Sequence, residues 1–139
     1  MRLRNIIFTA AILTASPVVG AEEDNPENGQ DQSAARAVQA HVDAYRSGDL
    51  GRFLGTFAPD AIVNLNGVTV ATGHQQISAL YRVNFVQGAP AIRVDSSGMN
   101  GDLLFLSIAY IFPDGSEVCC SYSEYEVTNG KITRLYTQG

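Results

Sequence analysis

The chain has 139 residues, of which 45% are hydrophobic, and its 14 acidic against 9 basic side chains give a net charge of −5. This length fits a single domain that can bury a core. The acidic balance excludes the extended basic surface that nucleic-acid binding requires, so no nucleic-acid partner is expected.

The N-terminus has the order of features typical of a secretory signal peptide. Arg2 and Arg4 precede an apolar stretch over residues 6–13, and small residues follow over 18–21. The apolar stretch is shorter than the roughly 20 residues that span a bilayer, and no cysteine follows to carry a lipid. We therefore expect a signal peptide over 1–21, export to the periplasm or the extracellular space, and no stable membrane anchor after cleavage. A buried N-terminal helix is the alternative.

Residues 22–31 form an acidic segment that contains Pro26 and lacks apolar periodicity. Such a composition predicts a disordered spacer. The folded domain is accordingly expected over 32–139.

Two amphipathic helices are predicted next. Ser33 is a candidate N-cap for the first, which Gly48 should end, and Asp49 is a candidate N-cap for a shorter second helix that Pro59 should terminate. Apolar residues recur at helical spacing in both. Each helix should therefore cover part of a core.

A hairpin and a third helix follow. Asn66-Gly67 joins apolar runs over 62–65 and 68–71, which is a strong hairpin signal. Thr72 and Gln75 then have capping-box spacing, so a helix is expected up to Gly88.

From residue 89 onward the pattern is extended, with glycine-containing turns separating four predicted strands. These strands cover 91–99, 102–112, 116–127 and 131–138. Helices followed by an antiparallel meander indicate an α+β fold.

The turn at 113–115 decides which face of strand 102–112 looks inward. A three-residue loop with a glycine bulge, which we prefer, places Phe105, Ser107, Ala109 and Ile111 on the face shared with Ser121, Ser123 and Tyr125. A plain two-residue turn would exchange the two faces. The same loop type at Asn129-Gly130 would add Thr133, Leu135 and Thr137 to the inner face.

The run over 42–85 resembles the nuclear transport factor 2-like superfamily, which includes SnoaL-like polyketide cyclases and ketosteroid isomerases. The likeness rests on the order of helices and hairpin around the following motifs: Ser47-Gly48-Asp49, Ala58-Pro59-Asp60-Ala61, Asn66-Gly67 and Thr72-Gly73-His74. It implies a cystatin-like α+β roll, in which a curved antiparallel sheet wraps three N-terminal helices around one pocket.

The resemblance does not extend to the isomerase chemistry. His41, Leu65 and Ser123 stand where those enzymes have their tyrosine and two aspartates. Ketosteroid isomerisation by that mechanism is therefore not expected.

Polar side chains that should face the pocket form the candidate site. His41 and Tyr45 lie one helical turn apart, so the imidazole could act as a general base while the tyrosine polarises a carbonyl. The expected ligand-binding residues are Ser107, Ser123, Tyr125 and Thr137. The alternative for His41 is a hydrogen-bonded core histidine, and Tyr81 is interpreted as ordinary core.

The outward face of strand 102–112 would carry five large apolar side chains, namely Leu104, Leu106, Ile108, Tyr110 and Phe112. Burying each is worth about 1.5–3 kcal/mol, and monomers rarely expose such a patch. A homodimer through the outer sheet face is therefore expected. With the other register, Leu103, Phe105 and Ile111 would form that face.

Cys119 and Cys120 are the only cysteines. Because neighbouring residues of a strand point to opposite faces, a bond between them would need a distorted peptide, so we interpret them as two small core residues. An intermolecular disulfide is the alternative. No metal or cofactor motif is present.

The leading hypothesis is an exported cone that binds a small, largely apolar molecule, with acid–base chemistry of the isomerase or hydrolase type through His41. The rival is a non-catalytic dimeric binding or interaction protein whose pocket is filled by its own side chains.

Overall fold

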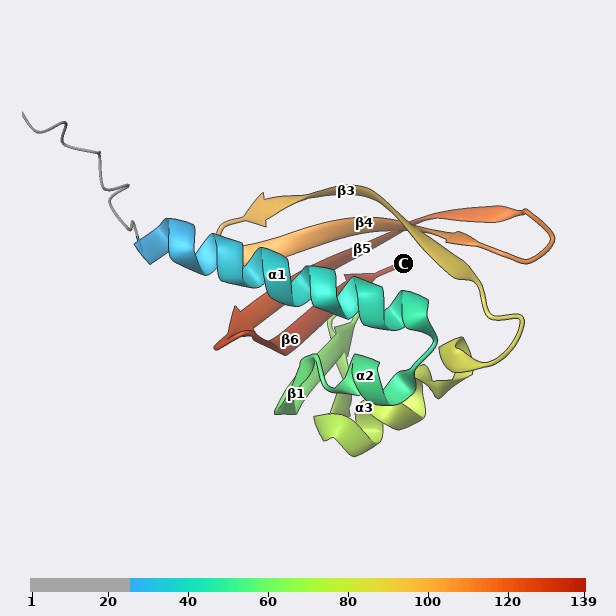
Figure 1. Cartoon of the computed structure of the whole chain (residues 1–139), viewed down its shortest axis with the longest axis horizontal. Helices are drawn as coiled ribbons and strands as arrows, with labels where there is room; N and C mark the ends of the chain where they lie inside the picture. Colours follow the sequence, from blue (N-terminus) through green and yellow to red (C-terminus); the bar gives the residue numbers. More distant parts are fainter. Residues whose placement is uncertain (1–25) are drawn as a thin grey trace, which may run out of the picture.

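A six-stranded curved sheet wraps around three α-helices (Figure 1). The computed structural model describes residues 26–139. The predicted signal peptide and residues 22–25 lie outside this range. The elements are α1 (Pro26–Ser47), α2 (Leu50–Leu54), β1 (Phe57–Leu65), β2 (Val68–Thr72), α3 (Gly73–Tyr81), the 3₁₀ turn η1 (Arg82–Phe85), β3 (Ala91–Asn100), β4 (Leu103–Ile111), β5 (Glu117–Thr128) and β6 (Lys131–Gln138).

The strand order in the sheet is β2-β1-β6-β5-β4-β3. Neighbouring strands are antiparallel except β1 and β6, which are parallel. The predicted α+β class and the meander of four late strands are therefore confirmed, while the expectation of a wholly antiparallel sheet is wrong at one pair. The parallel pair arises because the helix-rich connection over 73–90 separates the first hairpin from the meander.

Helix α1 crosses the concave face of the sheet, and α2 and α3 lie at the end of the sheet formed by β1 and β2 (Figure 1). The core between them contains Val38 and Val42 from α1, Phe53 from α2 and Ile77 from α3. The long helix thus fills one part of the cone.

The helix begins earlier than the sequence indicated. Its first residue is Pro26, so residues 26–31 of the predicted spacer are helical, and Ser33 lies inside the helix rather than at its cap. Proline suits the first helical position because its missing N–H would be unpaired there. Acidic residues near a helix N-terminus also interact favourably with the helix dipole.

The later caps are partly as predicted. Asp49 caps α2 by accepting a hydrogen bond from the Arg52 amide at 3.0 Å, which confirms that prediction. The short helix ends at Gly55, and Pro59 lies inside β1 instead of terminating the helix. At α3 the capping partner is Gln76, whose side chain accepts from the Thr72 amide at 2.8 Å.

The hairpin at Asn66-Gly67 is confirmed, with both residues at positive φ and β1 paired to β2 across it. The three-residue loop at 113–115 also forms as predicted, since the Phe112 amide bonds to the Ser116 carbonyl and Gly115 has a positive φ.

The face of β4 that looks inward is nevertheless the opposite of the one we preferred. Next to the loop, Tyr110 pairs with Val118, but further along Ile108 pairs with Ser121. Cys119 and Cys120 therefore oppose the single residue Ala109, which makes a β-bulge. A shift of one residue exchanges the faces of a strand, so Leu104, Leu106 and Ile108 are buried on the concave side.

On β6 the predicted inward residues Leu135 and Thr137 pair with Tyr125 and Ser123, as expected. The extra residue that keeps them inward is Thr133, at a bulge within the strand and not in the Asn129-Gly130 turn.

Candidate functional site

An open chamber of about 430 Å³ lies at the end of the cone beyond α1. Its walls come from β1, β2, α3, η1 and the ends of β4, β5 and β6. The lining residues are mostly apolar, and none of their side chains carries a charge: Val63, Leu65, Val70, Leu80, Tyr81, Asn84, Tyr110, Val118, Cys119, Cys120, Ser121, Thr137 and Gly139. This volume is in the range of small-molecule sites.

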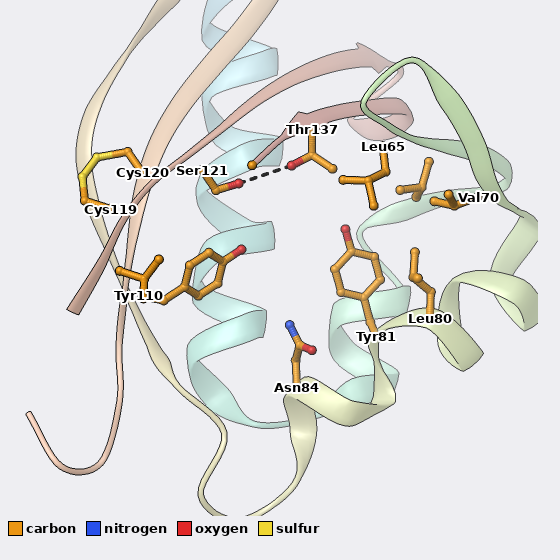
Figure 2. Close-up of a pocket in the computed structure, with 13 residues that line it drawn as sticks. Leu65, Val70, Leu80, Tyr81, Asn84, Tyr110, Cys119, Cys120, Ser121 and Thr137 are labelled. Carbon is orange, nitrogen blue, oxygen red and sulfur yellow. Dashed lines mark hydrogen bonds between the residues drawn. A yellow bond between two sulfur atoms is a disulfide. The ribbon is translucent and has the colours of Figure 1, made fainter. Parts of the chain in front are cut away.

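Two tyrosines stand on opposite sides of the chamber, with their hydroxyls directed into it (Figure 2). Tyr81 comes from the last turn of α3 and Tyr110 from β4. Within residues 29–139, neither hydroxyl has a hydrogen-bond partner in the protein. Both are therefore free to bond to water or to a bound molecule.

The far wall of the chamber carries two hydroxyls that face each other. Ser121 Oγ lies 3.4 Å from Thr137 Oγ1, and Ser123 donates to the same Thr137 oxygen at 3.1 Å. Ser121 and Thr137 thus add a small polar patch to an otherwise apolar wall.

Burial raises the pKa of Tyr81, and the neighbouring Tyr125 and Tyr110 add to the rise. A tyrosine with a raised pKa stays protonated at neutral pH and keeps its proton for donation. The chamber therefore offers neutral hydrogen-bond donors but no strong base.

A much smaller cavity of about 50 Å³ lies further inside. Tyr81, Asn84, Tyr110 and Thr137 line both spaces, so they form the partition between them, and His41 lies on the inner side. An inner cavity of this size has room for water but not for a substrate.

His41 is buried among aromatic rings. Its ring centroid lies 4.5 Å from that of Phe53, 5.0 Å from that of Phe57 and 5.4 Å from that of Tyr125. Its Nδ1 is 2.8 Å from Thr56 Oγ1, and that hydroxyl donates its one hydrogen to the Phe53 carbonyl. The imidazole must therefore donate from Nδ1, which assigns the neutral Nδ1–H tautomer.

Burial lowers the pKa of His41 to about 3. Such a group is uncharged at neutral pH and is a weak base. The surroundings of His41 are those of a core histidine, and its assignment as a general base stays a prediction.

The other predicted site residues are divided between the two spaces. Tyr45, Ser123 and Tyr125 line the inner cavity, whereas Thr137 lines both. The Tyr45 hydroxyl accepts a hydrogen bond from Asn84 at 3.3 Å, and burial raises its pKa.

Ser107 does not join the other predicted site residues. It pairs with Tyr122 and Ser96 on the convex side of the sheet and lines neither cavity. The prediction that it faces the pocket is wrong, because the bulge at Cys119 and Cys120 exchanges the faces of β4.

Three of the chamber residues with side-chain hydrogen-bonding groups were not predicted to face it: Tyr81, Asn84 and Tyr110. Tyr110 would have been found with the alternative register, in which it faces inward. Tyr81 was interpreted as core from its helical spacing with Ile77, and nothing in the sequence shows that α3 ends at the chamber.

Cys119 and Cys120 are joined to each other by a disulfide and are exposed, so their interpretation as core residues is wrong. The alternation rule behind that interpretation applies to regular strands, whereas these two residues occupy the bulge. With Asp95 they form the one group in the described part of the chain whose ligand atoms could hold a metal, all within 4.8 Å. Sulfur binds metals as thiolate, so the disulfide withholds two of the three ligands.

No helix within residues 26–139 is long and apolar enough to cross a membrane.

Comparisons with known proteins identify the fold. No protein-family model matches the chain, and no curated protein matches its sequence. Among solved structures, it is similar to an NTF-2 like protein from Burkholderia xenovorans LB400, with 22% identity, 78% of this chain and 83% of that chain covered, and a TM-score of 0.62. The chain has the nuclear transport factor 2-like fold.

A putative polyketide cyclase from Sinorhizobium meliloti shares this NTF2-like fold, with 24% identity, 73% of this chain and 93% of that chain covered, and a TM-score of 0.63. A de novo designed protein with a curved β-sheet is about as similar, with 20% identity, 77% and 84% covered, and a TM-score of 0.64. One fold can host many unrelated functions, so likeness of fold by itself assigns no activity to this chain.

Proposed function

We propose that this NTF2-like domain is an exported protein that binds a small, neutral, largely apolar molecule bearing an oxygen acceptor. The observation that carries the proposal is the uncharged chamber of about 430 Å³, into which the Tyr81 and Tyr110 hydroxyls point without hydrogen-bond partners among residues 29–139. Apolar walls supply affinity by burying the ligand, and the two donors would orient its carbonyl, ether or hydroxyl oxygen.

Export remains a prediction from residues 1–21. An exposed disulfide supports it, because disulfides persist in oxidising compartments such as the periplasm and the extracellular space.

Binding is favoured over acid–base chemistry by the position of His41. The imidazole lies behind the partition, has a pKa lowered to about 3 and is surrounded by aromatic rings. A ligand in the chamber would meet tyrosine, serine, threonine and asparagine side chains, none of which is a strong base at neutral pH.

Blocking the chamber should abolish binding. Val70 lines it, so Val70→Trp should weaken binding of the neutral, carbonyl-bearing dye prodan at least tenfold, measured by fluorescence titration. Val68→Trp is the matched control: Val68 lies on the same strand but does not line the chamber. The proposal fails if the parent protein does not bind prodan, or if the two variants bind it equally.

The same titration tests the two donors. Tyr81→Phe and Tyr110→Phe should each weaken prodan binding by about 0.5–1.5 kcal/mol, the net worth of one hydrogen bond. Dimethylaminonaphthalene, which lacks the carbonyl, should bind parent and variants alike. Equal losses for both dyes would mean that the tyrosines only shape the wall.

We also propose that the protein dimerises through the convex face of the sheet, although the residues on that face differ from those first expected. Phe105 stacks on Tyr122 there at 5.6 Å, while the three leucine and isoleucine residues first expected on that face are core. Phe105→Arg should convert a dimer to a monomer in sedimentation velocity, and Val83→Arg, at an exposed site on η1, should not. A parent protein that sediments as a monomer at micromolar concentration contradicts the proposal.

A further inference from the structure

The disulfide between Cys119 and Cys120 is placed where reagents can reach it. Both cysteines are exposed, and both line the open chamber beside Val118 and Ser121. They are the only cysteines in the chain. Exposed disulfides are the labile ones, whereas structural disulfides are usually protected from attack.

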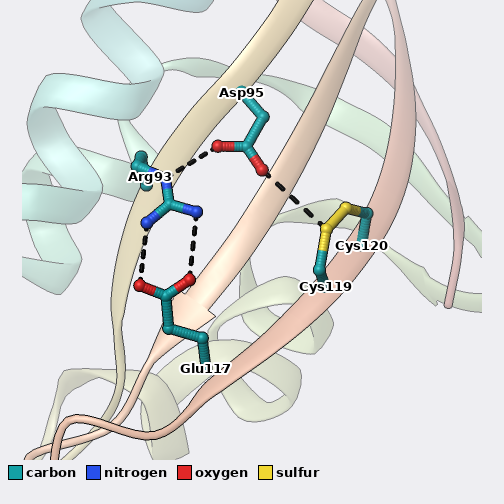
Figure 3. A network of polar contacts seen from close by, with 5 residues as sticks. All are labelled: Arg93, Asp95, Glu117, Cys119 and Cys120. Atoms are coloured by element: carbon teal, nitrogen blue, oxygen red, sulfur yellow. Dashed lines mark hydrogen bonds and ion pairs between the residues drawn. A yellow bond between two sulfur atoms is a disulfide. The ribbon is translucent and has the colours of Figure 1, made fainter.

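An asymmetric set of charges lies on one side of this disulfide (Figure 3). Asp95 Oδ2 is 3.8 Å from the Sγ of Cys119, while Asp95 Oδ1 accepts from Arg93 Nε at 2.7 Å. The other end of the same guanidinium binds Glu117 through two contacts of 2.9 and 3.1 Å.

This group carries a net negative charge, because one guanidinium faces two carboxylates. Arg93 is neutralised from both sides, and it lowers the pKa of Glu117. A disulfide sulfur has no hydrogen to donate, so the carboxylate of Asp95 faces the bonded sulfur of Cys119 without a hydrogen bond.

We propose that the Cys119–Cys120 pair is a thiol–disulfide exchange site that reacts with small thiols and selects them by charge. The incoming thiolate attacks the Sγ of Cys120, because the Cys119 thiol that this attack releases, once protonated, can donate a hydrogen bond to Asp95. This inference does not depend on the ligand proposed for the chamber.

The disulfide is reduced in two exchange steps. In the first, the thiolate sulfur bonds to Cys120, the bond between the cysteines breaks, and the electron pair goes to Cys119, which takes a proton from water. The protonated thiol of Cys119 can then donate to Asp95. In the second, another thiolate attacks the outer sulfur of the mixed disulfide and releases Cys120. Two small thiols are thereby oxidised to their disulfide while the protein disulfide becomes two thiols.

Charge selection follows from Coulomb attraction and repulsion at the surface. One unit charge within several ångströms of the attacking sulfur changes the rate about three- to tenfold in this setting. Cationic cysteamine should therefore react faster, and anionic thioglycolate slower, than their intrinsic reactivities predict.

The experiment measures rates of reduction of the oxidised full-length protein by cysteamine and by thioglycolate, and compares the ratio of the two rates between variants. Intrinsic thiol reactivity cancels in this comparison. Asp95→Asn should lower the ratio about three- to tenfold, and Arg93→Gln should raise it. Asp102→Asn, which changes an exposed carboxylate in the β3–β4 turn, should leave it unchanged.

The opposite changes of the rate ratio in Asp95→Asn and Arg93→Gln distinguish an electrostatic effect from misfolding, because a loosened structure would react faster with both thiols. Alkylation during the first turnover, followed by fragment-ion mass spectrometry, should locate the mixed disulfide on Cys120. The proposal is overturned if the purified protein has two free thiols before any reductant is added, or if the folded protein is not reduced. It is also overturned if Asp95→Asn keeps the parent ratio, or if the adduct lies on Cys119.

Discussion

Replacing Phe53 by alanine is expected to lower the free energy of unfolding by about 3–5 kcal/mol, the range for deleting a buried aromatic ring. Phe53 is 1% exposed and is the centre of an aromatic cluster. Its ring lies between 4.5 and 5.9 Å from those of five neighbours: His41, Tyr45, Phe57, Tyr81 and Phe85. The cavity left by the ring would remove contacts from α1, α3, β1 and η1 at once.

Urea denaturation followed by circular dichroism measures this effect. Phe112→Ala is the matched control, because Phe112 is 37% exposed at the β4–β5 loop and its replacement should change stability by less than about 0.5 kcal/mol. Similar losses for both variants would show that Phe53 is not the packing centre. Because Tyr81 packs on Phe53 and also lines the chamber, Phe53→Ala should in addition weaken prodan binding.

Stability should fall as the pH is lowered through the usual pKa of histidine, because His41 must be neutral in the folded protein. Its pKa is about 3 in the folded protein, against the ordinary histidine value of 6.5, so between these pH values the unfolded chain binds the additional proton. Protonation therefore favours unfolding below pH 6.5, and the effect grows until the folded pKa is reached. Between pH 7.5 and 5 the loss should be about 2 kcal/mol.

Urea denaturation at the two pH values tests this, and His41→Gln supplies the comparison. The variant is expected to be less stable at pH 7.5, because it loses the ring contacts, but its stability should depend less on pH by about the same 2 kcal/mol. An unchanged pH dependence in His41→Gln would mean that His41 is accessible to protons when folded, and the catalytic hypothesis for it would gain support.

Local sequence signals predicted the elements well because their causes are local. Asn66-Gly67 forms the first hairpin since both residues adopt positive φ, and Asp49 caps α2 through its own side chain. The spacing of apolar residues and turns was sufficient for the α+β class and the strands of the meander. The start of α1 at Pro26 was predicted wrongly, because the acidic, proline-containing composition of residues 22–31 was interpreted as a disordered spacer although proline also suits the first position of a helix.

The composition of the candidate site depended on one tertiary feature that local patterns do not reveal. The loop at 113–115 forms as expected, yet the bulge at Cys119 and Cys120 moves Tyr110 into the chamber and Ser107 to the convex face. The α+β class follows from patterns of hydrophobicity and turns that act over a few residues, and the NTF2-like fold was implied by the resemblance of the helix and hairpin motifs. Strand pairing between distant segments determines which side chains face the chamber. Packing between distant segments encloses His41 in rings from three other elements. Only the tertiary structure therefore decided these two features.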